Sequence, residues 1–179
     1  MSFWLIVITC LFLGVIIIFC AFFICSTIFT APWVPSSKKD VFNILEAATI
    51  KEGDVIYDLG SGDGRIIINA AKKYPIKKAI GIEISPFFYL ISWLQILLAG
   101  LGSKVKVKLA NFYKVNLSDA NVVICYLFPK EMKKLADKFQ KELKPDTRVV
   151  SLAFPIVNWQ PEKIIRPSSG FKSIFIYKI

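Results

Sequence analysis

The stretch Val55-Ile56-Tyr57-Asp58-Leu59-Gly60-Ser61-Gly62-Asp63-Gly64-Arg65-Ile66 decides the fold. An apolar run ends in an acid, three closely spaced glycines follow, and an isoleucine-rich segment comes next. This order predicts a buried strand, a tight turn and the start of a helix. Glycine permits positive φ angles and close approach of a ligand, and the first N–H groups of a helix are open. We therefore predict a nucleoside-bearing cofactor at the carboxyl end of a parallel strand.

The glycine spacing separates two kinds of cofactor. A dinucleotide fingerprint G-x-G-x-x-G beginning at Gly60 would need its third glycine at the position of Arg65. The chain instead has G-x-G-x-G, and Asp58 precedes Gly60 by two residues. A carboxylate there would repel a pyrophosphate but attract the ammonium of S-adenosylmethionine, and the stretch resembles motif I of the class I methyltransferases. The residues of this turn predicted to hold S-adenosylmethionine are Asp58, Gly60, Ser61, Gly62 and Gly64.

Further cofactor contacts are predicted at the ends of the next two strands. Glu83 stands near the end of the apolar run 79–84. In Rossmann-like sheets an acid at the tip of the second strand accepts hydrogen bonds from ribose hydroxyls, so Glu83 and its neighbour Ile84 are expected at the cofactor. The alternative is a surface glutamate. Asn111 and Phe112 follow the third strand, where this fold contacts the adenine; an ordinary loop is the alternative.

The remaining pattern predicts an α/β fold, a Rossmann-like class I methyltransferase sheet that is mostly parallel and closes with an antiparallel hairpin. Ser37 and Asp40 form a plausible capping box for the first helix of the domain. Alternating lysines predict an edge strand at 104–109, and a continuous apolar run predicts a central strand at 122–127. Other strands are predicted at 55–58, 79–84, 148–154, 162–165 and 173–177, and helices at 64–74, 86–99 and 129–143.

The predicted helix 86–99 is unusual because no charged residue occurs between Ile84 and Ser103. About 14 residues are too few to span a bilayer. A helix that is apolar on all sides is usually buried, so we predict a helix inside the fold. The alternative is that one face contacts lipid or packs on a membrane anchor.

The front of the chain predicts such an anchor. Residues 1–37 carry no charged side chain, and nearly every residue from Phe3 to Thr30 is apolar. Roughly 20 apolar residues span a bilayer core. A signal peptide is disfavoured because a positive n-region is missing and the run is too long. We predict a single transmembrane anchor over residues 1–31, a linker over 32–36 and a methyltransferase domain over 37–179.

Charge indicates the orientation and the partners. No basic residue precedes the apolar segment, whereas Lys38 and Lys39 follow it, so the positive-inside rule predicts a cytoplasmic domain on a single-pass membrane protein. The net charge of +10 suits an anionic bilayer, an acidic substrate or nucleic acid. Beside an anchor, the membrane bilayer is the simplest partner. The chain has no histidine, and its four cysteines lack metal-ligand spacing, so no metal is predicted.

Several stretches together resemble the small membrane-anchored protein-lysine methyltransferases. Mitochondrial members of that family modify the adenine nucleotide translocase and the c-subunit of ATP synthase, and prokaryotic relatives exist. Besides residues 57–66, the stretches that carry the resemblance are Trp33–Ser36, Leu117–Ile124, Glu142–Pro145 and Asn158–Pro161. The uncharged segment 86–99 departs from the family pattern, in which more polar residues are expected.

The resemblance implies methyl transfer from S-adenosylmethionine to a lysine of a protein substrate, here a membrane protein. Amine methyltransferases place acceptor-contacting residues at the end of the fourth strand, where this chain has Tyr126, Phe128 and Pro129. Core packing is their alternative, and Trp33 and Trp159 are weaker candidates. Without histidine, we expect desolvation of the acceptor lysine or a water path rather than a side-chain base. A methyltransferase of a lipid, quinone or other apolar small molecule stays open; nucleic acid is disfavoured because residues 126–129 lack an Asn-Pro-Pro-Tyr type of motif.

Overall fold

The computed structural model describes the backbone of residues 3–29, 35–166 and 172–179, with side chains described for all of these except 18–29. The elements in chain order are α1 (Phe3–Phe29), α2 (Lys38–Ala47), β1 (Val55–Leu59), α3 (Arg65–Lys73), β2 (Lys78–Glu83), α4 (Pro86–Leu98), β3 (Val105–Leu109), β4 (Val122–Cys125), α5 (Pro129–Glu142), β5 (Arg148–Leu152), β6 (Lys163–Ile165) and β7 (Ile174–Lys178). Each predicted strand and helix of the domain is present, with ends that differ by at most two residues.

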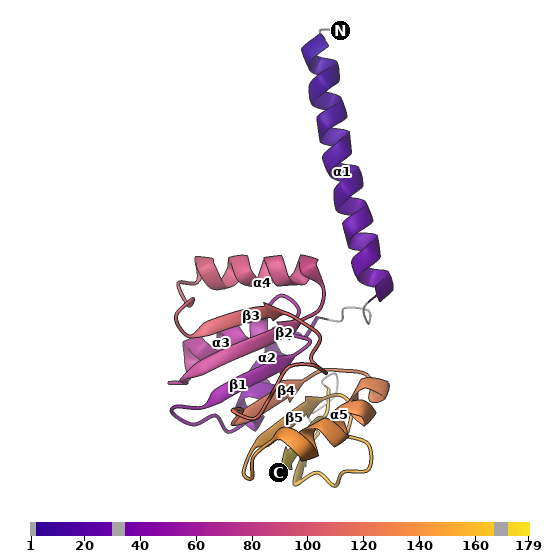
Figure 1. Cartoon of the computed structure of the whole chain (residues 1–179). Helices are drawn as coiled ribbons and strands as arrows, with labels where there is room; N and C mark the ends of the chain where they lie inside the picture. Colours follow the sequence, from indigo (N-terminus) through magenta and orange to yellow (C-terminus); the bar gives the residue numbers. More distant parts are fainter. Residues whose placement is uncertain (1–2, 30–34, 167–171) are drawn as a thin grey trace.

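The strands form one sheet in the order β3-β2-β1-β4-β5-β7-β6 (Figure 1). β3 lies at an edge, as its alternating lysines predict, and β1 pairs in parallel with β2 and β4 at the centre. β7 runs antiparallel between β5 and β6, which confirms the predicted closing strands; the expected turn at 167–170 lies outside the described residues. The strand order reverses between β1 and β4, and such a switch point opens a crevice at the carboxyl ends of the strands.

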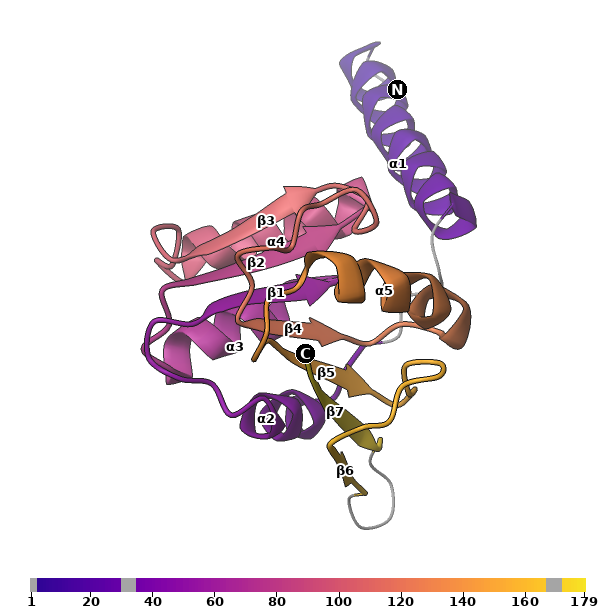
Figure 2. The ribbon, with the colours of Figure 1, turned by 60° about the horizontal axis from the view of Figure 1, so that its bottom comes forward.

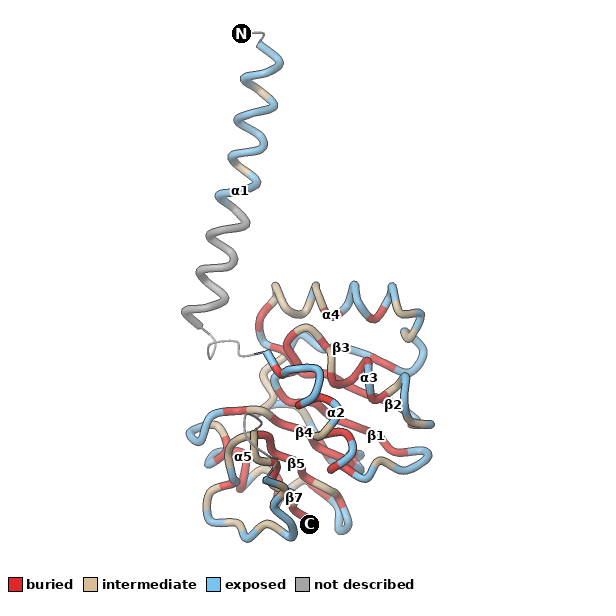
Figure 3. Tube along the Cα trace, turned by 180° about the vertical axis from the view of Figure 1, so that it is seen from behind, coloured by how far each residue is buried: buried red, intermediate tan, exposed pale blue. Residues whose placement is uncertain are grey.

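Helices cover both faces of this sheet (Figure 2). On one face, α2, α3 and Ile96 of α4 pack on Ile56, Ile124 and Val150. On the other face, the apolar side of α5 packs with Leu117 on strands β1, β2, β4 and β5. Figure 3 shows the buried residues concentrated in the strands and the inner sides of the helices. The two cores hold the strand ends in fixed positions relative to one another.

The helices α2 and α4 begin with different caps. The predicted capping box of α2 is confirmed: Ser37 Oγ accepts from the Asp40 N–H at 3.0 Å, and Asp40 Oδ2 accepts from the Ser37 N–H at 3.2 Å. For α4, Ser85 is the N-cap residue and Pro86 takes the first helical position. The Ser85 hydroxyl makes no capping bond, and the Ser85 N–H donates to Glu83 Oε1 at 2.8 Å.

The prediction that helix 86–99 is buried inside the fold is wrong. Within α4 only Ser92 and Ile96 are buried, whereas the outer face exposes large apolar side chains. α4 lies over β2 and β3, where the sheet ends, so only one side of the helix meets the core. The uncharged sequence therefore reflects an apolar surface rather than an interior position.

α1 is a long helix that extends away from the domain and contacts α4 (Figure 1). Its described side chains, at residues 3–17, are apolar and mostly exposed. In the part of the chain whose side chains are described, no helix has the length and apolar character needed to cross a membrane. The side chains at 18–34, which include Trp33 and most of the predicted linker, lie outside the described part of the chain.

Candidate active site

A cavity of about 400 Å³ lies at the carboxyl ends of the parallel strands. The residues predicted from the sequence that line it are Asp58, Gly60, Ser61, Gly62, Glu83, Ile84, Asn111, Phe112, Tyr126 and Phe128. They come from segments far apart in the chain, and the sheet order brings them to one edge. Two predicted residues are absent from the lining: Gly64 caps α3 and Pro129 is the first residue of α5.

The glycine turn after β1 adopts the conformation that its sequence predicts. Gly60, Gly62 and Gly64 have φ angles of 79°, 54° and 81°, which side-chain-bearing residues rarely adopt. The N–H groups of Gly60 and Ser61 both donate to the Ile82 carbonyl, at 2.9 and 3.1 Å, and so bind the turn to β2. The N-terminus of α3 is thereby directed at the cavity edge.

The turn also depends on close contacts with its neighbours. A Cβ atom at Gly64 would collide with Ser92 of α4. A Cβ atom at Gly81 of β2 would lie 2.5 Å from Ser61 Oγ and 2.8 Å from Ile67 Cδ1. Gly81 is therefore the position at which β2 lets the glycine turn pack against the sheet.

Replacing Gly81 by alanine is expected to destabilise the protein by about 1–3 kcal/mol, because an added methyl group in a packed site forces its neighbours to shift. The same displacement of Ser61 should weaken cofactor binding. The matched control is Gly102→Ala, since a Cβ atom there meets nothing within 4 Å. Urea unfolding of the two variants measures the effect; equal stability of both would contradict this packing account.

Asp58 is the most unusual charged group of the cavity. It is 2 % exposed, and its Oδ2 accepts no hydrogen bond from the residues that the structure describes. Burial, together with the charges of Glu83 and Asp63, raises the pKa of Asp58 to about 8. A buried carboxylate without a partner is costly, and a cationic ligand group in the cavity would relieve that cost. The ammonium of S-adenosylmethionine fits this requirement.

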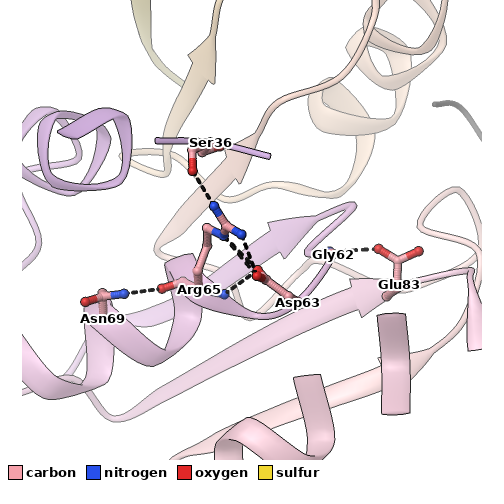
Figure 4. A network of polar contacts seen from close by, with 6 residues as sticks. All are labelled: Ser36, Gly62, Asp63, Arg65, Asn69 and Glu83. Atoms are coloured by element: carbon pink, nitrogen blue, oxygen red, sulfur yellow. Dashed lines mark hydrogen bonds and ion pairs between the residues drawn. The ribbon is translucent and has the colours of Figure 1, made fainter. Parts of the chain in front are cut away.

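Glu83 is held by two backbone donors. Its Oε2 accepts from the Gly62 N–H and its Oε1 from the Ser85 N–H, both at 2.8 Å. The carboxylate thus ties the glycine turn to the end of β2 (Figure 4). Each carboxylate oxygen keeps a second lone pair, so the group can still accept hydrogen bonds from a diol. The alternative of a surface glutamate is excluded, because Glu83 is 7 % exposed.

Arg65 joins the glycine turn to the segment that enters the domain. Its guanidinium forms an ion pair with Asp63, with N–O distances of 2.6 to 3.1 Å, and donates to the carbonyl of Ser36 (Figure 4). Pro35 and Ser36 line the cavity. The position of this wall, which is formed by the last two residues of the predicted linker, is therefore fixed by a side chain of motif I.

Asn111 and Phe112 lie on the cavity wall after β3. Asn111 Oδ1 accepts from the Tyr113 N–H at 3.0 Å, which fixes the amide in a local turn. Its NH₂ group can still donate to a ligand. The Phe112 and Tyr113 rings meet edge to face, 4.5 Å between centroids. These features suit a planar base at the predicted adenine position.

An aromatic wall stands at the end of β4. Tyr126, Phe128 and Phe154 line the cavity, and the rings of Phe128 and Phe154 are 5.9 Å apart. Lys172 stands over the Tyr126 ring at 5.2 Å from its centroid and forms an ion pair with Asp40 at 2.9 Å. The N-terminus of α2 and the start of β7 therefore meet beside this wall.

Two weaker acceptor candidates have different outcomes. Trp159 does not line the cavity; its half-buried ring packs against the core beneath α5, with its centroid 6.3 Å from that of Phe139 and 5.8 Å from that of Tyr177. The prediction for Trp159 is wrong, because the turn at 157–160 folds under α5 instead of toward the strand ends. Trp33 lies outside the described residues.

Several residues that line the cavity were not predicted from the sequence. These are Pro35, Ser36, Asp63, Arg65, Ile66, Phe88, Tyr113, Leu127, Lys130, Glu131, Lys134 and Phe154. Asp63 and Arg65 lay within the quoted motif, and their opposite charges could have signalled an ion pair. Nothing local in the sequence marks Phe154 or Phe88, because they reach the cavity only through the packing of the sheet.

Comparisons with known proteins agree with this geometry. Residues 58–163 match the family described as the ANTKMT methyltransferase domain. The chain is 40% identical over 146 residues to a protein-lysine N-methyltransferase of Saccharolobus islandicus, covering 82% of this chain and 91% of that protein. It is 34% identical over 148 residues to the adenine nucleotide translocase lysine N-methyltransferase of Mus musculus, covering 83% of this chain and 63% of the mouse protein.

Solved structures extend the agreement to the cofactor. A crystal structure of an RNA methyltransferase from Salinibacter ruber, in complex with S-adenosyl-L-homocysteine, superposes with a TM-score of 0.78 at 34% identity. The match covers 82% of this chain and 94% of that chain. The family match includes the glycine turn, Glu83 and the end of β4. The chain therefore belongs to the ANTKMT methyltransferase domain family and is a class I, S-adenosylmethionine-dependent methyltransferase.

Proposed function

We propose that this enzyme methylates the ε-amine of a lysine in a membrane-associated protein. The observation that carries the lysine assignment is the 40% identity to a protein-lysine N-methyltransferase over 91% of its length. The mouse relative, named as a lysine N-methyltransferase of the adenine nucleotide translocase, supports the same acceptor class. S-adenosylmethionine supplies an electrophilic methyl group when it is bound.

The cofactor-binding roles follow from the positions in the cavity. Asp58 pairs with the methionine ammonium, and Glu83 accepts hydrogen bonds from the ribose hydroxyls while it holds Gly62. Asn111 donates to the adenine, and Phe112 packs against the base. The full proposed cofactor set is Asp58, Gly60, Ser61, Gly62, Gly64, Glu83, Ile84, Asn111 and Phe112, with Gly64 acting through the shape of the turn.

The acceptor lysine enters beside Tyr126 and Phe128. A free lysine has a pKa of about 10.4, so its amine must lose a proton before it can attack the methyl group. An aromatic wall lowers that pKa because it withholds water from the charged form. The same rings attract a cation, which orients an incoming ammonium before it loses its proton and offsets part of the lowering of the pKa. Alignment of amine and methyl group then accounts for much of the rate.

We further propose that residues 1–31 form a single-pass membrane anchor, residues 32–36 a linker and residues 37–179 the catalytic domain. The support is the absence of charged side chains from residues 1–37, together with the apolar run that begins at Phe3. Burial of so long an apolar helix in lipid removes its side chains from water. Attachment to the bilayer confines the active site to a thin layer and favours membrane proteins as substrates.

Lys38 and Lys39, which follow the proposed anchor, support a cytoplasmic position of the domain under the positive-inside rule. Protease added to right-side-out membrane vesicles is expected to leave the domain intact, and protease added to inverted vesicles should digest it. A cytoplasmic marker protein of known orientation serves as the control. Digestion in right-side-out vesicles alone would reverse the proposed orientation.

A second candidate acceptor is RNA, because the Salinibacter ruber neighbour is described as an RNA methyltransferase and the net charge is +10. A lipid, a quinone or another apolar small molecule is the third. Detergent-solubilised enzyme, incubated with labelled S-adenosylmethionine and membranes of its own source, separates the three. We expect the label in a protein band at a lysine; label confined to the lipid extract or to RNA would overturn the lysine assignment.

A further inference from the structure

The outer face of α4 is an apolar surface without a described partner in the domain. Its exposed large apolar residues are Leu90, Trp93, Leu94, Leu97 and Leu98, with exposed fractions from 48% to 77%, and Gln95 is exposed among them. Soluble proteins rarely expose so continuous a patch of large side chains. We call these five residues the α4 patch.

The composition around the α4 patch differs from that of a helix facing water. No charged residue occurs between Ile84 and Ser103. The outer face of α5, by contrast, carries Lys130, Lys133, Lys134 and Lys141, and it shows what a water-facing helix of this same domain looks like. A need for solubility in water therefore does not explain the uncharged, apolar outer face of α4.

The place of α4 in the molecule points to what covers it. α4 contacts α1, and Figure 1 shows α4 lying across the side of the domain from which α1 rises. Phe88, near the N-terminal end of α4, lines the active-site cavity. The helix that carries the patch therefore meets both the proposed membrane anchor and, through Phe88, the cavity wall.

Positive charge also lies at this edge of the sheet, but on its other face. Val105 and Val107 of β3 pack in the core beneath α4, so the alternating Lys106 and Lys108 point to the opposite face. Lipid is the occupant of the α4 patch that the contact of α4 with α1, the proposed anchor, supports. The net charge of +10 favours an anionic bilayer over a neutral one.

We propose that α4 is an interfacial helix, which seats its leucines and Trp93 in the headgroup region of an anionic bilayer. The inference rests on the proposed membrane anchor and adds a second point of attachment. Two attachments fix the orientation of the domain relative to the bilayer, whereas a single anchor leaves it free to rotate about one point. The cavity wall at Phe88 is then held at the bilayer surface, and acceptor lysines are selected by their closeness to it.

The direct test uses the domain 35–179, which lacks α1. Both hydrophobic cores are built from residues 41–177 without any described residue of α1, and the Saccharolobus islandicus relative is matched over 91% of its length by the domain-sized aligned region. Sedimentation with vesicles of phosphatidylglycerol and phosphatidylcholine measures partitioning. The variant Leu94→Glu/Leu98→Glu is expected to partition about tenfold less, because leucine side chains contribute most of the burial.

The matched control is Phe42→Glu/Ile164→Glu, which also places two acids on exposed apolar positions, but on α2 and on the far edge strand β6. It should partition like the unmodified domain. Calorimetry with S-adenosylmethionine confirms that every variant is folded.

Three results would overturn the inference. The unmodified domain could fail to bind vesicles, both double variants could partition equally, or sedimentation without lipid could show a dimer that Leu94→Glu/Leu98→Glu dissociates. None of these measurements needs methyl transfer. If the acceptor is not a lysine, the vesicle measurements still test the role of α4. If the domain does not bind vesicles, the acceptor can still be a lysine.

Discussion

Replacement of Asp58 by alanine is expected to lower the affinity for S-adenosylmethionine by about 10- to 150-fold, because a hydrogen bond to a charged group contributes about 1.5–3 kcal/mol. Glu83→Ala should have an effect of the same size, since it removes the ribose acceptor and also frees the Gly62 N–H. Calorimetric titration measures both. Glu52→Ala, which removes an exposed acid before β1, is the control.

Proton release tests the same role for Asp58 independently of affinity. In the free protein the raised pKa of about 8 keeps Asp58 protonated at about pH 6.5, whereas a bound ammonium favours the carboxylate. Binding at that pH should release close to one proton, and affinity should rise with pH up to about 8. Titrations in buffers of different ionisation enthalpy count the proton. Asp58→Asn should release none.

The sign of the stability effect follows from the same pKa. The folded protein holds the Asp58 proton more tightly than the unfolded chain, whose aspartates have a pKa of about 3.9. Stability that is present below about pH 4 is therefore lost as the pH rises toward 8. Asp58→Asn should gain stability over the unmodified protein across that range. Wild-type affinity in Asp58→Ala, with no proton released by the wild type, would contradict the assignment.

Removal of residues 1–34 is expected to lower methylation of a membrane-embedded target by about a hundredfold or more, because tethering to the same bilayer raises the effective concentration of the target. Cofactor affinity should stay unchanged, since Asp58 and Glu83 are buried in the domain, whose two hydrophobic cores include no described residue of α1. The measurement is the initial rate of methyl transfer with the target in reconstituted vesicles.

Two controls separate tethering from damage to the enzyme. A soluble peptide that carries the acceptor lysine should be methylated at the same rate with and without residues 1–34. An unrelated single-span helix fused ahead of residue 35 should restore most of the lost rate. A truncated enzyme that is as fast as the full chain on the embedded target would rule out anchoring as the source of substrate choice.

Much of the fold was predictable because local signals and tertiary structure agree. The glycines of motif I require positive φ angles at three positions, and the structure has them. Continuous apolar residues in β4 and alternating lysines in β3 distinguish a central strand from an edge strand, and the sheet order confirms both. Glu83 was predictable because parallel strands place their carboxyl ends together.

The errors come from features that local patterns do not encode. An apolar helix is buried in most folds, but α4 covers an edge of the sheet, where no described strand or helix of the domain covers its outer side. Lys172 reaches Asp40 from 132 residues away, and Arg65 reaches Ser36 across 29 residues. Trp159 was predicted as an acceptor-site residue, whereas it packs against Phe139 of α5 at the edge of the core.

The central claim, methylation of a lysine in a membrane protein, is tested most directly by mass spectrometry. Membrane proteins from cells with the gene are compared with those from cells that lack it and from cells that carry the Asp58→Ala variant. We predict a lysine close to the cytoplasmic bilayer surface that is methylated only when the active enzyme is present. The claim would be contradicted if lysine methylation of membrane proteins were the same in all three kinds of cell. The difference would then be a methyl group missing only from a lipid, a quinone or an RNA base.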